Sequence, residues 1–405
     1  MFVRKKIYGL MMIGAMLLAG CTQDDVTADV PPTTLVPISF DCSVINDDAP
    51  TTRSAIGYTG VIYNENKELK YTGFGVFASH ASGTIPDLMY NQEVEFVFQS
   101  SVTGYWTYSP VKYWPANPIG TCFYAYAPYV PTPTSSPEDL LDDGNTGIIG
   151  MSSNSGTSPF VFYARANHPE ENVDLLWCFK QISESDNSDD GILEETDDGK
   201  LRPKGNTALD MTFNHALTRM KVSLGITNGT SLPVGSKLLV KRVTFTGNFA
   251  KTGQLNLASA ETTPTWGNQD VVSTSETIFI DCNPNRDVAS SASYGIIAEG
   301  VRYIDNLPVS WQPAGLPHVN YDSTNATTKA ATSTNLLCMG DVPSYIYLIP
   351  QSDLSFTCVI DYCIIDSEGN LVDYHKTTES ASISIPTLNG NTTYDLTLTI
   401  TIPTI

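Results

Sequence analysis

The sequence predicts an all-β protein made of two antiparallel β-sandwich domains. Apolar and polar residues alternate in short runs, for example at 74–77, 94–98 and 220–224, which is the periodicity of half-buried strands. Glycine (29 residues) and proline (25 residues) separate such runs, and a charged fraction of only 16% argues against helical bundles and coiled coils. The length of 405 residues exceeds what one sandwich needs, so we expect two domains.

The first 20 residues are typical of an export signal. A basic start at 4–6 precedes an apolar run of about 12 residues, well short of the ~20 that a permanent transmembrane helix needs. The run ends in Leu18-Ala19-Gly20-Cys21, which resembles the lipobox of bacterial lipoproteins. We therefore expect residues 1–20 to be a lipoprotein signal peptide and Cys21 to carry lipid, palmitate included. A plain cleavage site is the alternative.

Residues 21–36 predict a tether, because a short stretch rich in proline, threonine and acidic residues cannot bury enough surface to fold. Its pair Asp24-Asp25 resembles the signal that sends lipoproteins of Bacteroidota to the cell surface, or it is ordinary tether polarity. Eight carboxylates between residues 181 and 200 then predict an acidic loop that ends a first domain at 37–200. Residues 201–405 form the second domain.

The second domain carries two clear strand signals. Residues 354–365 and 371–375 flank a five-residue loop with glycine, which predicts a hairpin. At the C-terminus apolar side chains alternate strictly with aspartate or threonine, which gives a strand with one apolar face. These apolar residues are Tyr394, Leu396, Leu398, Ile400 and Ile402. Such a strand could be donated to another sheet or could close its own sheet.

Charge and motif content exclude several classes of function. Lysine and arginine number 22 against 43 acidic residues, a net charge of −21 that argues against nucleic acid as a partner. The histidines lack the spacing of a zinc site, and neither a G-x-S-x-G nor a Walker motif occurs. We therefore expect no enzyme, no metal and no cofactor. The cysteines other than Cys21 are expected to be mostly free, buried thiols.

Aromatic residues are concentrated at 105–115 and 123–129. They could stack on sugar rings, but their alternation favours a role in filling a sandwich core.

Several segments in order along the chain make the sequence resemble the fimbrillin family, the type V pilin-like lipoproteins of Bacteroidota. They are 37–40, 52–55, 74–78, 111–115, 123–128, 174–176, 213–219, 347–351 and 394–398. The resemblance implies two transthyretin-like sandwiches, export as a lipoprotein, proteolytic removal of an N-terminal strand after an arginine, and polymerisation by strand donation.

Applied to this chain, the resemblance makes Arg53 and Ser54 the candidate cleavage site, in a polar stretch that contains Pro50. An ordinary exposed arginine is the alternative. The expected function is a stalk or tip subunit of a cell-surface fimbria that supports adhesion. The expected partners are other fimbrial subunits, outer-membrane lipid through Cys21, and a host or bacterial surface ligand. A surface glycan-binding lipoprotein that does not polymerise is the second hypothesis, and a secreted hydrolase with a hidden site is the third.

Overall fold

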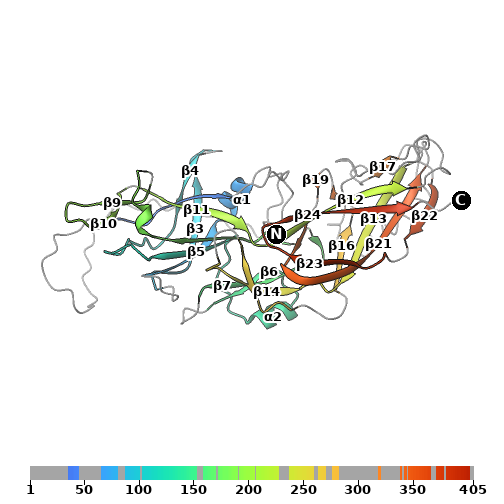
Figure 1. Ribbon diagram of the computed structural model, residues 1–405, viewed down its shortest axis with the longest axis horizontal. Helices are drawn as coiled ribbons and strands as arrows, with labels where there is room; N and C mark the ends of the chain where they lie inside the picture. The colour runs from blue at the N-terminus through green and yellow to red at the C-terminus, as the bar shows by residue number, and fades with distance from the viewer. Residues whose placement is uncertain are drawn as a thin grey trace, which may run out of the picture. The chain divides into compact units, whose positions relative to one another are not determined.

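The computed structural model describes residues 35–44, 65–80, 87–100, 103–152, 158–169, 172–189, 191–205, 207–227, 237–259, 263–270, 276–281, 318–320, 338–339, 342–343, 345–365, 371–377 and 380–401. The predicted signal peptide, Cys21, Arg53, Ser54 and Ile402 lie outside these ranges, as does all but the end of the predicted tether. Within them the chain is built mainly from strands, with two short α-helices, α1 (Glu65–Thr72) and α2 (Pro137–Asp142). The all-β prediction is confirmed (Figure 1).

A seven-stranded sheet holds most of the strands from the first half of the chain. Its order is β1 (Phe40–Val44), β11 (Leu209–His215), β8 (Leu176–Gln181), β5 (Cys122–Ala127), β2 (Phe74–Ser79), β3 (Met89–Phe98) and β4 (Gly104–Thr107). Neighbouring strands are antiparallel except β1 and β11, which run parallel. A four-stranded sheet contains β15 (Thr265–Gly267), β14 (Thr252–Asn256), β7 (Phe160–Ala164) and β6 (Gly147–Met151).

Two further sheets come from the second half. A three-stranded sheet has the order β20 (Tyr345–Leu348), β12 (Thr218–Thr227) and β24 (Thr393–Thr401), and β12 pairs parallel with β24. A six-stranded sheet runs from β16 (Glu276–Asp281) through β13 (Lys237–Gly247) and β21 (Gln351–Ile365) to β22 (Leu371–Lys376). In that sheet β17 (His318–Asn320) adds to β13, and β23 (Ile383–Leu388) adds to β21. The remaining pairs are β9 (Leu193–Glu195) with β10 (Leu201–Pro203), and β18 (Cys338–Met339) with β19 (Val342–Pro343).

The strands expected at 74–77, 94–98 and 220–224 are present as parts of β2, β3 and β12. The hairpin expected around residues 366–370 is also present, because β21 and β22 pair antiparallel and Ile365 lies opposite Leu371. In β3, Val94 is buried between the exposed Glu93 and Glu95, as alternation predicts, whereas all six residues of β2 are buried.

The acidic segment is more structured than the extended surface segment that its charge predicts. It contains the β9–β10 hairpin, and Ile192 and Leu193 are buried against the core of the seven-stranded sheet. Strands that follow it complete sheets that precede it: β11 pairs with β8, and β14 pairs with β7. The division into domains at residue 200 stays a prediction.

The aromatic residues mostly fill the core. Phe123, Tyr124, Tyr126 and Trp114 are buried, whereas Tyr105 and Tyr113 are 51% and 44% exposed. The four cysteines whose side chains the structure describes are buried thiols that form no disulfide, as predicted: Cys42, Cys122, Cys178 and Cys358.

Candidate functional site: the groove filled by β1

Strand β1 occupies one edge of the seven-stranded sheet. Phe40 to Val44 pair residue by residue with Leu209 to Phe213 in parallel register. Alternate side chains point into the core, so Phe40, Cys42 and Val44 are buried while Asp41 is exposed. The segment therefore contributes a row of apolar side chains from the edge of the sheet.

The chain just before β1 is bound on its other side. The Ile38 amide donates to the Lys112 carbonyl (2.9 Å), and the Trp114 amide donates to the Val36 carbonyl (3.0 Å). The Tyr108 hydroxyl also donates to the Ile38 carbonyl at 2.8 Å. From residue 39 the partner changes, since the Leu209 amide donates to the Ser39 carbonyl at 2.8 Å. The stretch 36–44 thus lies in a groove with two walls of backbone hydrogen-bonding groups, which we call the β1 groove.

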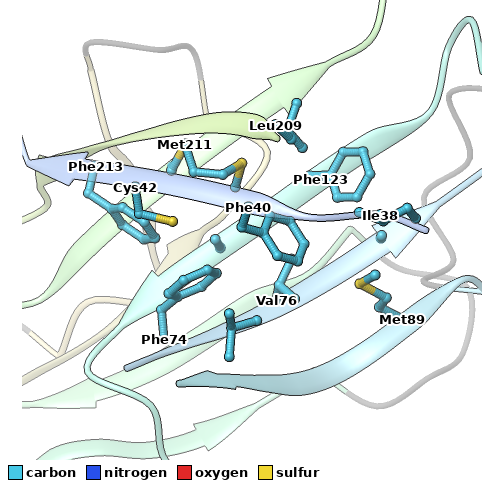
Figure 2. Close-up of a cluster of buried hydrophobic side chains, with 14 of the residues drawn as sticks. Ile38, Phe40, Cys42, Phe74, Val76, Met89, Phe123, Leu209, Met211 and Phe213 are labelled. Carbon is cyan, nitrogen blue, oxygen red and sulfur yellow. The ribbon is translucent and has the colours of Figure 1, made fainter. Parts of the chain in front are cut away.

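Phe40 fills an aromatic pocket in the floor of the β1 groove. Its ring lies 5.8 Å from that of Phe74, 5.6 Å from that of Tyr108 and 6.1 Å from that of Phe123, measured between centroids. Figure 2 shows the Phe40 ring among Phe74, Phe123 and the residues of β11. We call the three surrounding rings the Phe40 pocket. Each such aromatic pair contributes about 0.5–1.5 kcal/mol beyond the burial of its area.

Two thiols lie in the same core cluster as the Phe40 pocket. Cys42 comes from β1 and Cys178 from β8. Burial raises the pKa of the Cys42 thiol well above its usual value, because the thiolate would lose its hydration, and nearby Cys178 raises this pKa further. The Cys42 thiol is therefore held in the unreactive protonated form while β1 is in place.

The predicted terminal strand is present as β24. Thr393 to Thr401 pair parallel with Arg219 to Thr227, so in this structure β24 completes the chain's own sheet. Leu398 is buried and Tyr394 and Leu396 are partly buried against the same core, while Asp395 and Thr397 are exposed. Ile400 lies opposite Ile226 in the ladder. The predicted alternation is thus confirmed from 394 to 398, and donation of the strand stays a prediction.

The two terminal strands pair with consecutive strands of one segment. β1 pairs with β11 and β24 pairs with β12. Only Ala216 and Leu217 separate β11 from β12. A buried pair holds this junction, since His215 Nδ1 lies 2.8 Å from Asp174 Oδ2. The sequence does not indicate that residues 209–227 pair with both of these strands, because the pairing is long-range. The alternating Leu209, Met211 and Phe213 were the available signal.

Nothing in the described part of the chain suggests a metal centre. No group of three or more histidine, cysteine, aspartate or glutamate side chains is arranged to hold a metal ion there. The two α-helices of the described ranges are also too short to cross a bilayer.

Sheets built almost entirely from strands, with β1 and β24 each at the edge of one, define the described part of the chain as an all-β protein. The sequence model described as fimbrillin-like matches residues 61–405, and the chain belongs to this family.

Relatives bear related descriptions. Fimbrium subunit Fim1C of Phocaeicola vulgatus is 25% identical over 240 residues, which is 56% of this chain and 53% of that protein. This chain therefore spans about half the length of that curated relative. A crystal structure of a fimbrial protein from Bacteroides vulgatus is 17% identical and aligns with a TM-score of 0.48 over 90% of this chain and 95% of that one. A candidate cell adhesion protein from Bacteroides uniformis is 12% identical and has a TM-score of 0.41 over 92% and 94% of the two chains. None of these three is described as an enzyme.

Proposed function

We propose that the protein is a structural subunit, stalk or tip, of a cell-surface fimbria that supports adhesion. In this proposal the precursor is exported as an outer-membrane lipoprotein anchored through Cys21, cut after Arg53, and assembled by strand donation. Its partners are other fimbrial subunits, and a surface ligand on a host or bacterial cell. The observation that carries the proposal is the position of β1, an edge strand that supplies buried side chains and is followed by an arginine nine residues beyond Val44.

Removal of β1 would leave backbone hydrogen-bonding groups without partners and would expose part of the apolar core. The backbone of 207–213 and of 112–114 would lose hydrogen-bond partners. The side chains of Ile38, Phe40 and Val44 would leave the core, and each stabilises the folded state by about 1.5–3 kcal/mol when buried. An unpaired edge beside an apolar trough binds an added strand readily. Cutting after Arg53 would separate β1, together with the lipid at Cys21, from the rest of the chain.

The β24 strand of another subunit has the alternation that the emptied β1 groove requires. Its own pairing with β12 is the competing state, so donation requires β24 to leave that edge. The free energy gained when β24 fills the emptied β1 groove of the neighbouring subunit must therefore offset the loss of its pairing with β12. The donor must also remain folded.

The test uses the full chain with Cys21→Ser, treated with an arginine-specific protease. The expected product begins at Ser54 and forms polymers that resist heating in detergent. Arg53→Ala should remain an uncut monomer, and deletion of 393–405 should be cut without polymerising. Normal polymers from either variant would overturn the proposal.

Glycan binding without polymerisation is the second candidate, and exposed Tyr105 and Tyr113 are the observation that favours it. Exposed aromatic rings can stack on the faces of sugars. Tight polysaccharide binding by the cut chain, lost in Tyr105→Ala and Tyr113→Ala, together with concentration-independent monomers, would support this candidate.

A further inference from the structure

The two strands nearest the ends of the described chain, β1 and β24, share one order of side-chain types. From Ser39 in one and Thr393 in the other, the order is a hydroxyl residue, an aromatic residue, aspartate, an apolar residue, a hydroxyl residue and an apolar residue. The two sequences are Ser39-Phe40-Asp41-Cys42-Ser43-Val44 and Thr393-Tyr394-Asp395-Leu396-Thr397-Leu398. In both, the aspartate is exposed, and the aromatic and apolar positions turn toward the core. Both pair parallel with their neighbours, Phe40 opposite Leu209 and Tyr394 opposite Met220.

From this correspondence, and resting on the proposed function, we propose a specific register for strand exchange. Tyr394 of the incoming strand takes the place of Phe40, so that Asp395 lies opposite Asp210 and Leu398 takes the place of Val44. The Phe40 pocket is then the specificity-determining element, and it selects partner strands with an aromatic residue followed by aspartate, an apolar residue, serine or threonine, and another apolar residue.

The Phe40 pocket distinguishes this register from the others. A shift by one residue would turn every apolar side chain outward. A shift that puts Tyr394 at the position of Cys42 would force a large ring into the space of a small side chain, and overpacking costs about 1–3 kcal/mol. Tyr394 is also the one aromatic residue between 393 and 405.

The strongest competing register is shifted by four residues. It places Leu398 in the Phe40 pocket and aligns all five alternating apolar residues, Tyr394 to Ile402, with Val36 to Val44. In that register leucine replaces the ring that contacts Phe74, Tyr108 and Phe123, so these aromatic contacts are lost. It also places Thr399 rather than Asp395 opposite Asp210.

Disulfide trapping in the polymer separates the two registers. Asp210 and Asp395 are both exposed, so Asp210→Cys with Asp395→Cys leaves the cores intact. Directly paired residues on neighbouring strands lie about 4.8 Å apart. A shift of two residues adds about 6.6 Å at right angles, so the Cα atoms come to lie about 8 Å apart, beyond the ~7 Å limit for a disulfide. Matched pairs combine Asp210→Cys with Thr397→Cys or with Thr399→Cys. Each single variant serves as the background control.

We expect intermolecular disulfides in oxidised polymers of the Asp210→Cys and Asp395→Cys pair, at several-fold the yield of either matched pair. Dominant cross-linking through Thr397→Cys or Thr399→Cys would overturn the register while supporting strand donation. Polymers without a cross-link in any pair would count against donation itself. As a second measurement, Tyr394→Phe should keep the polymer's resistance to heat and Tyr394→Ala should lose it; equal polymers from both would overturn the role of the Phe40 pocket.

Discussion

Phe40 of β1 and Phe74 of β2 meet edge to face, with ring centroids 5.8 Å apart and an interplanar angle of 88°. Phe74 in turn contacts Trp106 (5.2 Å) and Phe213 (5.3 Å). The Phe40 side chain of β1 is thereby connected, through Phe74, to β2, β4 and β11. The edge strand is part of the core, which explains why its removal would have consequences across the sheet.

Phe40→Ala should therefore destabilise the chain strongly. Truncation of a buried phenylalanine usually lowers the free energy of unfolding by about 3–5 kcal/mol, through lost burial and the cavity that remains. Chemical denaturation of the uncut chain measures this value. Asp41→Ala is the matched control, because Asp41 is the exposed neighbour on the same strand. Equal effects of the two substitutions would show that the Phe40 pocket does not hold β1.

Because its thiol is buried, Cys42 should make the folded chain less stable at alkaline pH. Burial raises the pKa of its thiol in the folded chain, while the unfolded thiol has a pKa of about 8.5. Above that value the unfolded chain releases a proton that the folded chain retains, so the contribution to stability is complete below pH 8.5 and is lost as pH rises toward the folded value. The free energy of unfolding of the wild type should fall between pH 7.5 and 9.5, and Cys42→Ala should reduce the slope. An unchanged slope contradicts the prediction.

The buried pair at the β11–β12 junction gives a third prediction. His215 Nδ1 and Asp174 Oδ2 lie 2.8 Å apart with both side chains almost fully buried. Removal of one partner leaves a buried polar group unsatisfied, which costs about 1–3 kcal/mol. Asp174→Ala should lower the free energy of unfolding by this amount in chemical denaturation. The double variant with His215→Phe should recover part of the loss; strictly additive effects would argue against a coupled pair.

The sequence was informative where structure is local and less so where it is long-range. The alternation at 220–224 and at 354–365 identified β12 and part of β21, because burial on one face leaves a period of two in the sequence. No local pattern shows that Phe40 lies opposite Leu209, since parallel partners need a long connection. The charge of residues 181–200 concealed the buried Leu193. Which aromatic rings are buried depended on β5 being central in its sheet.

Lys221 should control the competition between the two positions of β24. In the chain's own sheet Lys221 lies opposite Asp395, so opposite charges face each other on the exposed side of the pair. In the proposed exchanged register Asp395 faces Asp210 instead. Opposite charges on paired strands stabilise by about 0.2–1 kcal/mol, and like charges destabilise. Lys221→Asp should therefore weaken the chain's own pairing alone and free β24 for donation.

The expected result is faster polymerisation of cut Lys221→Asp than of cut wild type at equal concentration, followed by light scattering. Lys221→Arg keeps the charge and is the matched control, so it should polymerise at the wild-type rate. The complementary change is a lock: Lys221→Cys with Asp395→Cys, oxidised before cutting, should hold β24 on β12 and stop assembly until a reductant is added. Because the lock leaves the β1 groove unchanged, polymers that form from the oxidised double variant would show that β24 is not the donated strand.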